Sequence, residues 1–282
     1  MPGCMFLNND AIPIPFLNQL CGATLDERKR LRMTILEKRG VFARSGTTIA
    51  GFLYRHGVIM AADCQTTFGM RKSLESVKIR EVGSHSIVGM AGMIACIQET
   101  YHILVDQMKQ FELWLQNDLF IEAQGKLLER ILKSNFFGLG ILGEILGYVA
   151  VPLLGGVDPR KKTAHLYAYD AAGAITDVTE KSCKYEAVGS GGSYARTVLD
   201  RAWAADMPRD DAIRLAVEAI HTAGMRDIAS GPAQIAPPIV ALATTSGISF
   251  VPKEQVSAYA YEIYTADLKR RGGPVVEEKK EE

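Results

Sequence analysis

Thr47 combines a hydroxyl group with a place in the chain where its own amine could be exposed. A threonine hydroxyl is a weak nucleophile until a base takes its proton. The α-amine of an N-terminal threonine can be that base, because its ordinary pKa lies near neutrality. Thr47 follows a small, flexible Ser45–Gly46 pair and opens a strand-like run, TTIAGFLY. The residue types therefore predict a nucleophile that exists only after the chain is cut between Gly46 and Thr47.

The setting distinguishes Thr47, since most single threonines are structural. Residues 1–46 contain the proline-punctuated run IPIPFLNQL and then the densely charged run DERKRLRMTILEKRG. Neither run shows the alternation of a strand, although the second could form a short amphipathic helix. We predict that residues 1–46 are a propeptide removed on maturation, and that the folded domain begins at Thr47.

The elements needed to position Thr47 can be read from periodicity. Two strands of a hairpin are expected at 47–54 and 58–63, and the second, VIMAA, is apolar enough to be buried on both faces. A polar loop follows to residue 76. Two more strands then precede two helices whose apolar residues recur at helical spacing. These elements are expected at 77–83, 85–92, 93–119 and 121–135.

The second half of the chain repeats the alternation of strands and helix pairs. Strands are expected at 147–154, 164–170, 174–179 and 239–252, and helices at 193–204, 208–227 and 256–271. The economical architecture is an α+β fold, a four-layer αββα sandwich of two mainly antiparallel sheets between helical layers. The domain is expected to span residues 47–265, and residues 266–282 to form a polar, disordered tail.

Composition argues against several other classes. Lys plus Arg and Asp plus Glu number 32 each, so no net charge favours nucleic acid or an anionic membrane. Five cysteines without a CxxC motif indicate reduced thiols in a cytoplasmic protein. Scattered histidines and a glycine cluster without phosphate-loop spacing predict no metal and no cofactor. The apolar segment 136–156 contains Glu144 and Pro152, so we expect a helix end and a core strand there.

The run GTTIAGFLYRHGVIMAAD resembles the start of a mature bacterial proteasome beta subunit, a member of the N-terminal nucleophile hydrolases. The similarity continues in order through VKIREV, SIVGMAGMIACIQE, PLLGGVD, YDAAGAITD, AVGSGGSYARTVLD and RDIASGP. It covers the chain from Thr47 to about residue 265. No single motif is decisive, but their order over most of the chain is highly specific.

The resemblance implies a catalytic role for seven residues. Thr47 would be the nucleophile, and its freed amine the proton acceptor. Asp63 would orient the site, and Lys78 would pair with Asp63 and lower the pKa of the amine. Gly92 would offer its backbone N–H to the oxyanion, while the amine would be held by Ser190, Asp227 and Ser230. The spacing from Asp63 to Lys78 is one residue shorter than the usual family pattern, which implies a deletion in the loop between them.

Each of these residues also has an ordinary structural interpretation. Asp63 could end a strand, and Lys78 could be a solvated edge lysine. Gly92 could begin a helix, and Ser190 could cap one. Asp227 and Ser230 could belong to a loop after a helix. Their joint occurrence with Thr47 favours the catalytic interpretation.

The resemblance also places a substrate pocket beside the GMAG turn and the loop after Asp63. Its wall would contain Thr66, Thr67, Met90 and Ile94. This wall is apolar and has no acidic floor. We therefore predict a preference for large apolar residues before the bond to be cut.

The family implies an endopeptidase that hydrolyses unfolded proteins after cutting off its own propeptide. Its beta subunits form seven-membered rings, fourteen copies per particle, between rings of alpha subunits, and an ATP-dependent unfoldase ring delivers substrates. The sequence leaves two alternatives open. One is a non-catalytic structural ring subunit of the same fold, and the other is an N-terminal nucleophile amidase that acts on small amides.

Overall fold

The computed structural model describes residues 44–68, 71–146 and 148–272. One sheet has the strand order β1-β7-β8-β9-β10, with β6 also paired to β7. Its strands are β1 (Arg44–Ser45), β6 (Ile79–Gly83), β7 (Ser86–Met93), β8 (Ala150–Asp158), β9 (Thr163–Tyr169) and β10 (Ile175–Asp177).

The other main sheet has the order β11-β2-β3-β12-β13. Its strands are β2 (Thr48–Tyr54), β3 (Gly57–Ala62), β11 (Tyr185–Gly189), β12 (Ile239–Thr244) and β13 (Gly247–Phe250). A small hairpin of β4 (Thr66–Phe68) and β5 (Arg71–Ser73) lies beside them. Every pairing among the described strands is antiparallel.

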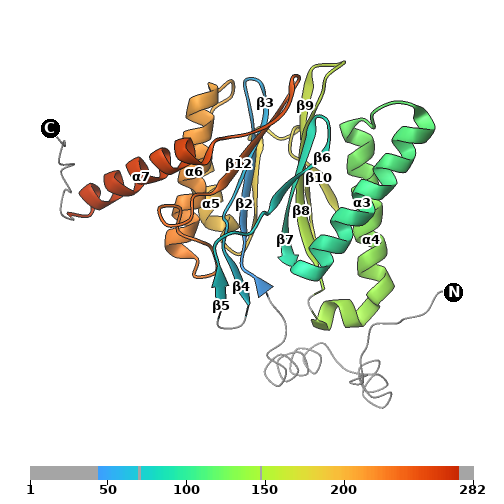
Figure 1. Cartoon of the computed structure of the whole chain (residues 1–282), viewed down its shortest axis with the longest axis horizontal. Coiled ribbons are helices and arrows are strands. Elements are labelled where there is room, and N and C mark those ends of the chain that lie inside the picture. The colour runs from blue at the N-terminus through green and yellow to red at the C-terminus, as the bar shows by residue number, and fades with distance from the viewer. Residues whose placement is uncertain (1–43, 69–70, 147, 273–282) are drawn as a thin grey trace, which may run out of the picture.

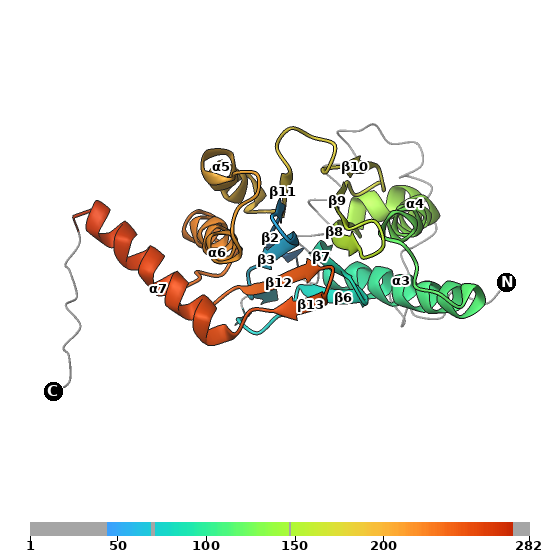
Figure 2. The same cartoon turned by 90° about the horizontal axis from the view of Figure 1, so that it is seen from above.

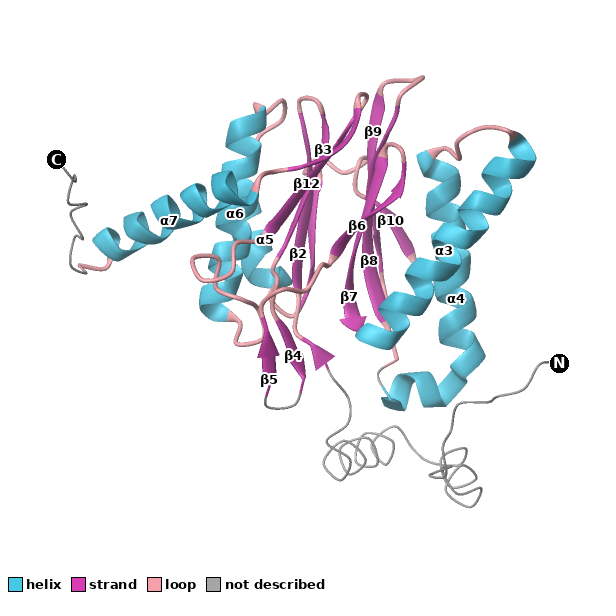
Figure 3. Cartoon of the chain, in the orientation of Figure 1, coloured by secondary structure: helices cyan, strands magenta, loops and turns pink. Residues whose placement is uncertain are grey.

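Helices cover the outer face of each sheet, so the molecule has four layers (Figures 1 and 2). The first sheet is covered by α3 (Ile94–Leu115) and α4 (Ile121–Leu146). The second is covered by α5 (Gly192–Ala202), α6 (Arg209–Arg226) and α7 (Lys253–Arg270). Figure 3 shows the two groups of strands between the helix groups. The α+β sandwich expected from the sequence is therefore confirmed.

The core follows the periodicity of the elements. In α3 the buried residues recur every four positions, at Cys96, Thr100, Leu104 and Met108, because such residues share one helix face. Strand β3 is buried along its whole length, as its apolar sequence predicted. Between the sheets, residues from both contribute to one buried cluster that includes Ile49, Met60, Ile87, Leu153 and Leu166.

Several boundaries differ from the expectation. The polar loop after Asp63 contains the β4–β5 hairpin, and β8 continues through Asp158, where a loop was expected. Helix α4 continues beyond residue 135 to Leu146, into the apolar segment where a helix end was expected, and α7 (Lys253–Arg270) begins three residues before the helix expected at 256–271. Strand β8 is extended by its pairing with β9, in which Val157 lies opposite Ala164 and Asp158 lies opposite Thr163. Residues 1–43 and 273–282, which hold most of the expected propeptide and tail, lie outside the described residues.

Segment 136–156 divides between the end of α4 and the start of β8, as expected. Within the part of the chain that the structure describes, no helix combines the length and apolarity needed to span a bilayer.

Candidate active site at the propeptide junction

A buried ion pair lies next to Thr47. Asp63 follows β3 and Lys78 precedes β6, and Lys78 Nζ lies 2.8 Å from Asp63 Oδ1. The Asp63 side chain is 0% exposed and the Lys78 side chain is 4% exposed. Two charges removed from water are costly unless hydrogen bonds satisfy them. Further hydrogen bonds to the pair must therefore offset the cost of burying its charges.

Asp63 accepts hydrogen bonds from three backbone N–H groups as well as from Lys78. Oδ1 accepts from Thr48 at 2.8 Å, and Oδ2 accepts from Gln65 and Gly231 at 3.0 Å each. These donors come from the start of β2, the segment after β3 and the loop after α6. Because so many donors converge on it, the carboxylate joins three segments of the chain at one point.

Lys78 also contacts the peptide bond expected to be cut. Its Nζ donates to the carbonyl oxygen of Gly46 at 3.1 Å. Burial lowers the pKa of the Lys78 ammonium below its ordinary value, while the charge and hydrogen bond of Asp63 oppose that fall. A cation is thus placed on the oxygen that would gain negative charge if the Gly46 carbonyl were attacked.

The end of the expected propeptide forms a strand against β7. Arg44 pairs with Met93, and Ser45 pairs with Gly92. This pairing carries the chain into the site, where Gly46 and Thr47 are both buried. The sequence showed no strand signal here, because the pairing depends on the free edge of β7 and not on an alternating pattern in residues 44–45.

Ser190, Asp227 and Ser230 form a hydrogen-bond network around the Thr47 nitrogen. The Thr47 N–H donates to Ser190 Oγ at 3.3 Å. Ser190 and Ser230 both donate to Asp227 Oδ2, at 2.6 and 2.7 Å. Since the single Ser230 proton goes to Asp227, the 2.7 Å contact between Thr48 Oγ1 and Ser230 Oγ makes Thr48 the donor. The network thus orients the Ser190 oxygen toward the nitrogen of Thr47.

Two glycines beside the segment from Ser45 to Thr47 allow close approach between backbone segments. Gly189 has φ 95°, and an added Cβ would lie 1.9 Å from the Thr47 carbonyl oxygen. Gly92 has φ 135°, and an added Cβ would lie 2.1 Å from the Val149 carbonyl oxygen. Both conformations strongly favour glycine. Gly92 therefore adopts a special conformation one residue before the end of β7, opposite Ser45 of β1, and its role toward an oxyanion stays a prediction.

The ordinary interpretations of these residues fit the structure less well. Lys78 is buried and paired, so it is not a solvated edge residue. Ser190 does not cap α5, whose N-cap is Gly191 without a side-chain hydrogen bond. Asp227 does end α6 as its C-cap, but its carboxylate also holds Ser190 and Ser230. The site residues expected from the sequence therefore converge on the Gly46–Thr47 bond.

The sequence did not single out Thr48, Gln65 or Gly231, which complete the site through main-chain and hydroxyl hydrogen bonds. Nearly every residue type has a backbone N–H group, so no sequence motif could have identified Gln65 and Gly231 as donors to Asp63. No sequence motif pointed to Ala229 either. A Cβ added to Gly46 would lie 1.9 Å from the Ala229 Cβ. Only glycine fits at position 46 in this conformation.

The residues expected to form a substrate wall are less closely joined. Met90 is buried in the cluster between the first sheet and α3 and α4. Ile94 begins α3 and is half-buried, and Thr66 is half-buried in β4. Thr67 lies in β4 opposite Lys72. Their contribution to substrate selection stays a prediction.

Neighbouring Cys64 is buried, and its thiol donates to the Pro237 carbonyl at 3.3 Å. Burial, together with the negative charge of Asp63, raises the pKa of this thiol. The described residues contain no group of His, Cys, Asp and Glu side chains arranged to hold a metal ion. The polar groups around Thr47 are hydroxyls, one ion pair and backbone amides.

Comparison with known proteins places this site in a wider context. Residues 43–235 match the Proteasome family, described as "Proteasome subunit". A protein named "Proteasome subunit beta" from Stackebrandtia nassauensis is 29% identical over 242 residues, covering 83% of this chain and 84% of that protein. Proteins of the same name from Frankia alni and Halorubrum lacusprofundi are each 32% identical, over 206 and 189 residues. These alignments cover 72% of both chains for the former, and 67% of this chain and 71% of the relative for the latter.

The buried ion pair generates a stability prediction. Asp63→Asn leaves the Lys78 cation buried without a counter-charge, so we expect the free energy of unfolding to fall by roughly 3–5 kcal/mol. Urea unfolding of the full chain measures this change. The double variant Asp63→Asn/Lys78→Met should recover part of the loss, because it also removes the buried cation. Equal stability of Asp63→Asn and wild type would contradict this account of the pair.

Proposed function

The chain belongs to the proteasome subunit family, and from this premise we propose that it is a catalytic beta-type subunit, a threonine endopeptidase that first cuts its own chain. One observation carries the proposal. Lys78 contacts both Asp63 and the Gly46 carbonyl oxygen, directly beside Thr47. A purely structural subunit has no need for a buried cation on that carbonyl.

In the proposed self-cleavage, the Thr47 hydroxyl oxygen attacks the carbonyl carbon of Gly46. Lys78 stabilises the negative charge that develops on the carbonyl oxygen. The C–N bond then breaks, the hydroxyl proton ends on the departing Thr47 nitrogen, and Gly46 becomes an ester on the Thr47 oxygen. Water hydrolyses this ester and releases the propeptide with a carboxylate at Gly46. Thr47 is left with a free hydroxyl and a free amine.

The same groups then serve substrate hydrolysis. The free amine takes the proton of the Thr47 hydroxyl as the oxygen attacks a substrate carbonyl, and later gives a proton to the leaving amine. Ser190, held by Asp227, lies within hydrogen-bonding distance of that nitrogen. The Lys78 charge favours the neutral, basic form of the amine. Water finally hydrolyses the acyl-threonine ester and restores the site.

The strand formed by the propeptide supports this order of events. Its pairing with Met93 and Gly92 lays an extended segment beside the reactive residue. A substrate strand could pair with the same edge once the propeptide has left, because main-chain hydrogen bonds do not depend on side-chain identity. The propeptide would thus act as the first substrate and as a temporary block.

Assembly and location follow from the family and remain part of the proposal. We propose seven-membered beta rings that stack with rings of alpha subunits and receive unfolded proteins from an ATP-dependent unfoldase in the cytoplasm. The equal numbers of acidic and basic residues give little repulsion between copies, which suits such an assembly. A leader-free assembled particle without peptidase activity would favour a structural subunit. A ringless protein active on small amides would favour an amidase.

The nucleophile is tested by Thr47→Ala. Because this variant lacks the attacking oxygen, we expect it to keep its propeptide and to show no peptide hydrolysis. Intact mass after co-expression with an alpha subunit measures processing, and a fluorogenic peptide measures turnover. Thr47→Ser keeps a hydroxyl and should retain partial processing. A processed, active Thr47→Ala protein would falsify the assignment.

The residue before the cut is tested by Gly46→Ala. A Cβ at position 46 would overlap Ala229, so the carbonyl has to move away from Lys78 and Thr47. We expect processing to slow at least about tenfold, equivalent to roughly 1.4 kcal/mol in the barrier. Mass spectrometry over time follows the loss of the propeptide. Ser45→Ala is the matched control and should be processed as wild type, since Ser45 pairs through its backbone. Wild-type kinetics in Gly46→Ala would contradict the steric explanation.

Substrate preference is tested with a peptide panel on the processed protein. Met90 and Ile94 flank Gly92 with apolar side chains, so peptides with a large apolar residue before the cut should be hydrolysed fastest. Peptides with an acidic or basic residue at that position serve as comparisons. Faster hydrolysis of the basic peptides would overturn the predicted preference while leaving the role of Thr47 intact.

A further inference from the structure

A separate cavity lies at the end of the sandwich opposite Thr47. Strand β2 starts at Thr48 beside the propeptide junction and ends at Tyr54 beside this cavity. At about 3.3 Å per residue, this strand separates the two by roughly 20 Å. The cavity has a volume of about 560 Å³, within the size range of small-molecule sites.

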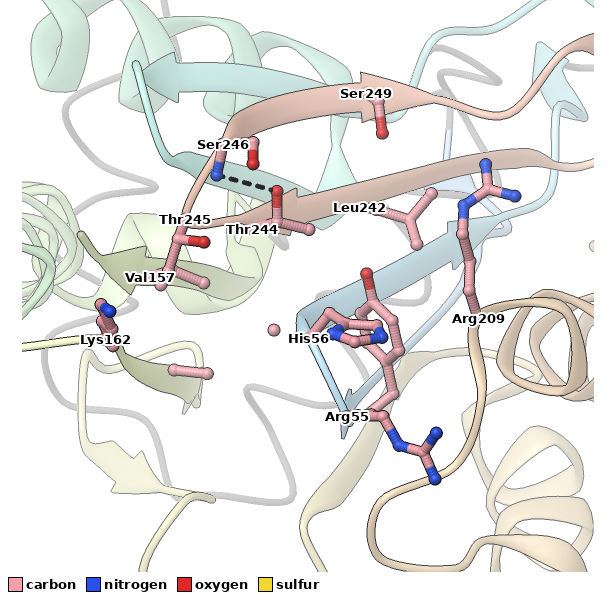
Figure 4. Close-up of a pocket in the computed structure, with 13 residues that line it drawn as sticks. Arg55, His56, Val157, Lys162, Arg209, Leu242, Thr244, Thr245, Ser246 and Ser249 are labelled. Atoms are coloured by element: carbon pink, nitrogen blue, oxygen red, sulfur yellow. Dashed lines mark hydrogen bonds between the residues drawn. The ribbon is translucent and has the colours of Figure 1, made fainter.

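Three hairpin turns and one helix start surround the cavity (Figure 4). Arg55 and His56 lie in the turn between β2 and β3, and Lys162 lies just before β9. Ser246 lies in the turn between β12 and β13, and Arg209 is the first residue of α6. Basic and hydroxyl-bearing residues that are far apart in the sequence therefore line one cavity.

The charged side chains that line this cavity are all of one sign. Its lining includes Arg55, Lys162 and Arg209, and it includes no carboxylate. Within the described part of the chain, Arg55 and Lys162 form no ion pair, and Arg209 contacts only the exposed carboxylate of Asp210, at 3.3 Å. An exposed contact of this kind is weak. Three cationic residues thus line one cavity in a chain whose total charge is zero, and a bound anion would offset their repulsion.

The acidic side chain at the β8–β9 turn, that of Asp158, already accepts hydrogen bonds within the turn. Asp158 accepts the N–H groups of Arg160 and Lys161, at 2.8 and 3.2 Å, and so fixes the turn that carries Lys162. Lys162 itself has φ 56°, in the left-handed region. The position of its backbone is therefore defined by the turn, while its ammonium remains available to a ligand.

Hydroxyl groups add donors of the kind that phosphate oxygens accept. Within the described residues, the hydroxyls of Thr245, Ser246 and Ser249 make no hydrogen bond, and all three residues are exposed at the cavity. Thr244 is different, because its hydroxyl already accepts the Ser246 N–H and donates to the Gly247 carbonyl. Buried Leu242 contributes an apolar part of the lining.

We propose that this cavity binds a small molecule that carries two or more phosphate groups. Arginine forks, a lysine and hydroxyls together match phosphate oxygens, which accept several charge-assisted hydrogen bonds. Lys162 and Arg209 lie on opposite sides of the cavity in Figure 4, with His56 between them. One phosphate group is small beside a 560 Å³ cavity, so linked phosphates are needed to reach both cations.

Calorimetric titration of the full chain with tripolyphosphate, at constant ionic strength, tests this proposal. We expect saturable one-site binding that weakens at least about tenfold in Arg55→Gln/Lys162→Gln. Lys109→Gln/Lys269→Gln is the matched control, because it removes the same charge from exposed residues of α3 and α7. It should bind within about twofold of wild type, since long-range effects are screened by salt.

A parallel titration with ATP distinguishes the source of the phosphates. Tighter binding of ATP than of tripolyphosphate would assign a nucleotide and a contact with the apolar wall, whereas equal binding would assign a polyphosphate chain. Peptide hydrolysis by Arg55→Gln/Lys162→Gln should match wild type, because both residues lie far from Thr47. Two results would overturn the proposal: no saturable binding of either probe, or equal weakening in the two double variants.

Discussion

The buried contact between Asp63 and Lys78 is the interaction on which the structure around Thr47 depends. Removing two charges from water costs several kcal/mol per ion, which only close geometry and further hydrogen bonds offset. Here the further bonds come from the N–H groups of Thr48, Gln65 and Gly231, and from the Gly46 carbonyl. The partners that satisfy the pair are thus the segments that must meet for the site to exist. The same hydrogen bonds therefore satisfy the buried charges and hold the segments of the site together.

Close approach of backbones is the second constraint. Gly189 approaches the Thr47 carbonyl, and Gly46 packs against Ala229, at distances that exclude any side chain. Chain segments can come this near only where glycine removes the Cβ. The loop that holds Asp227 and Ser230 therefore also restricts the residue before Thr47. Sterics at Gly46 and hydrogen bonding at Ser190 act on the same peptide bond from neighbouring positions.

The two sheets place the Gly46–Thr47 junction and the basic cavity at separate ends of the molecule. Antiparallel hairpins bring their turns to one end of a sandwich and their open ends to the other. At the turn end, Arg55, Lys162 and Arg209 gather around a cavity. At the other end, the start of β2 and the end of β7 hold the junction of Gly46 and Thr47. The length of strand β2 therefore separates the turns from the Gly46–Thr47 junction.

By itself, the sequence determined the elements whose signal is local. Apolar residues at helical or strand spacing located α3, the β2–β3 hairpin and the sandwich class, because packing one face requires that period. Ordered motifs also identified Thr47, Asp63 and Lys78, because the resemblance to the family depends on the residue types in those motifs. Only the tertiary structure decided the β1 strand, the β4–β5 hairpin and the main-chain donors to Asp63. It also decided the packing of Ala229 on Gly46 and the grouping of cations at the far turns. Apart from the β4–β5 hairpin and the Gln65 N–H donor, which are local but have no residue-type signal, these features arise between segments distant in the chain, so no local pattern encodes them.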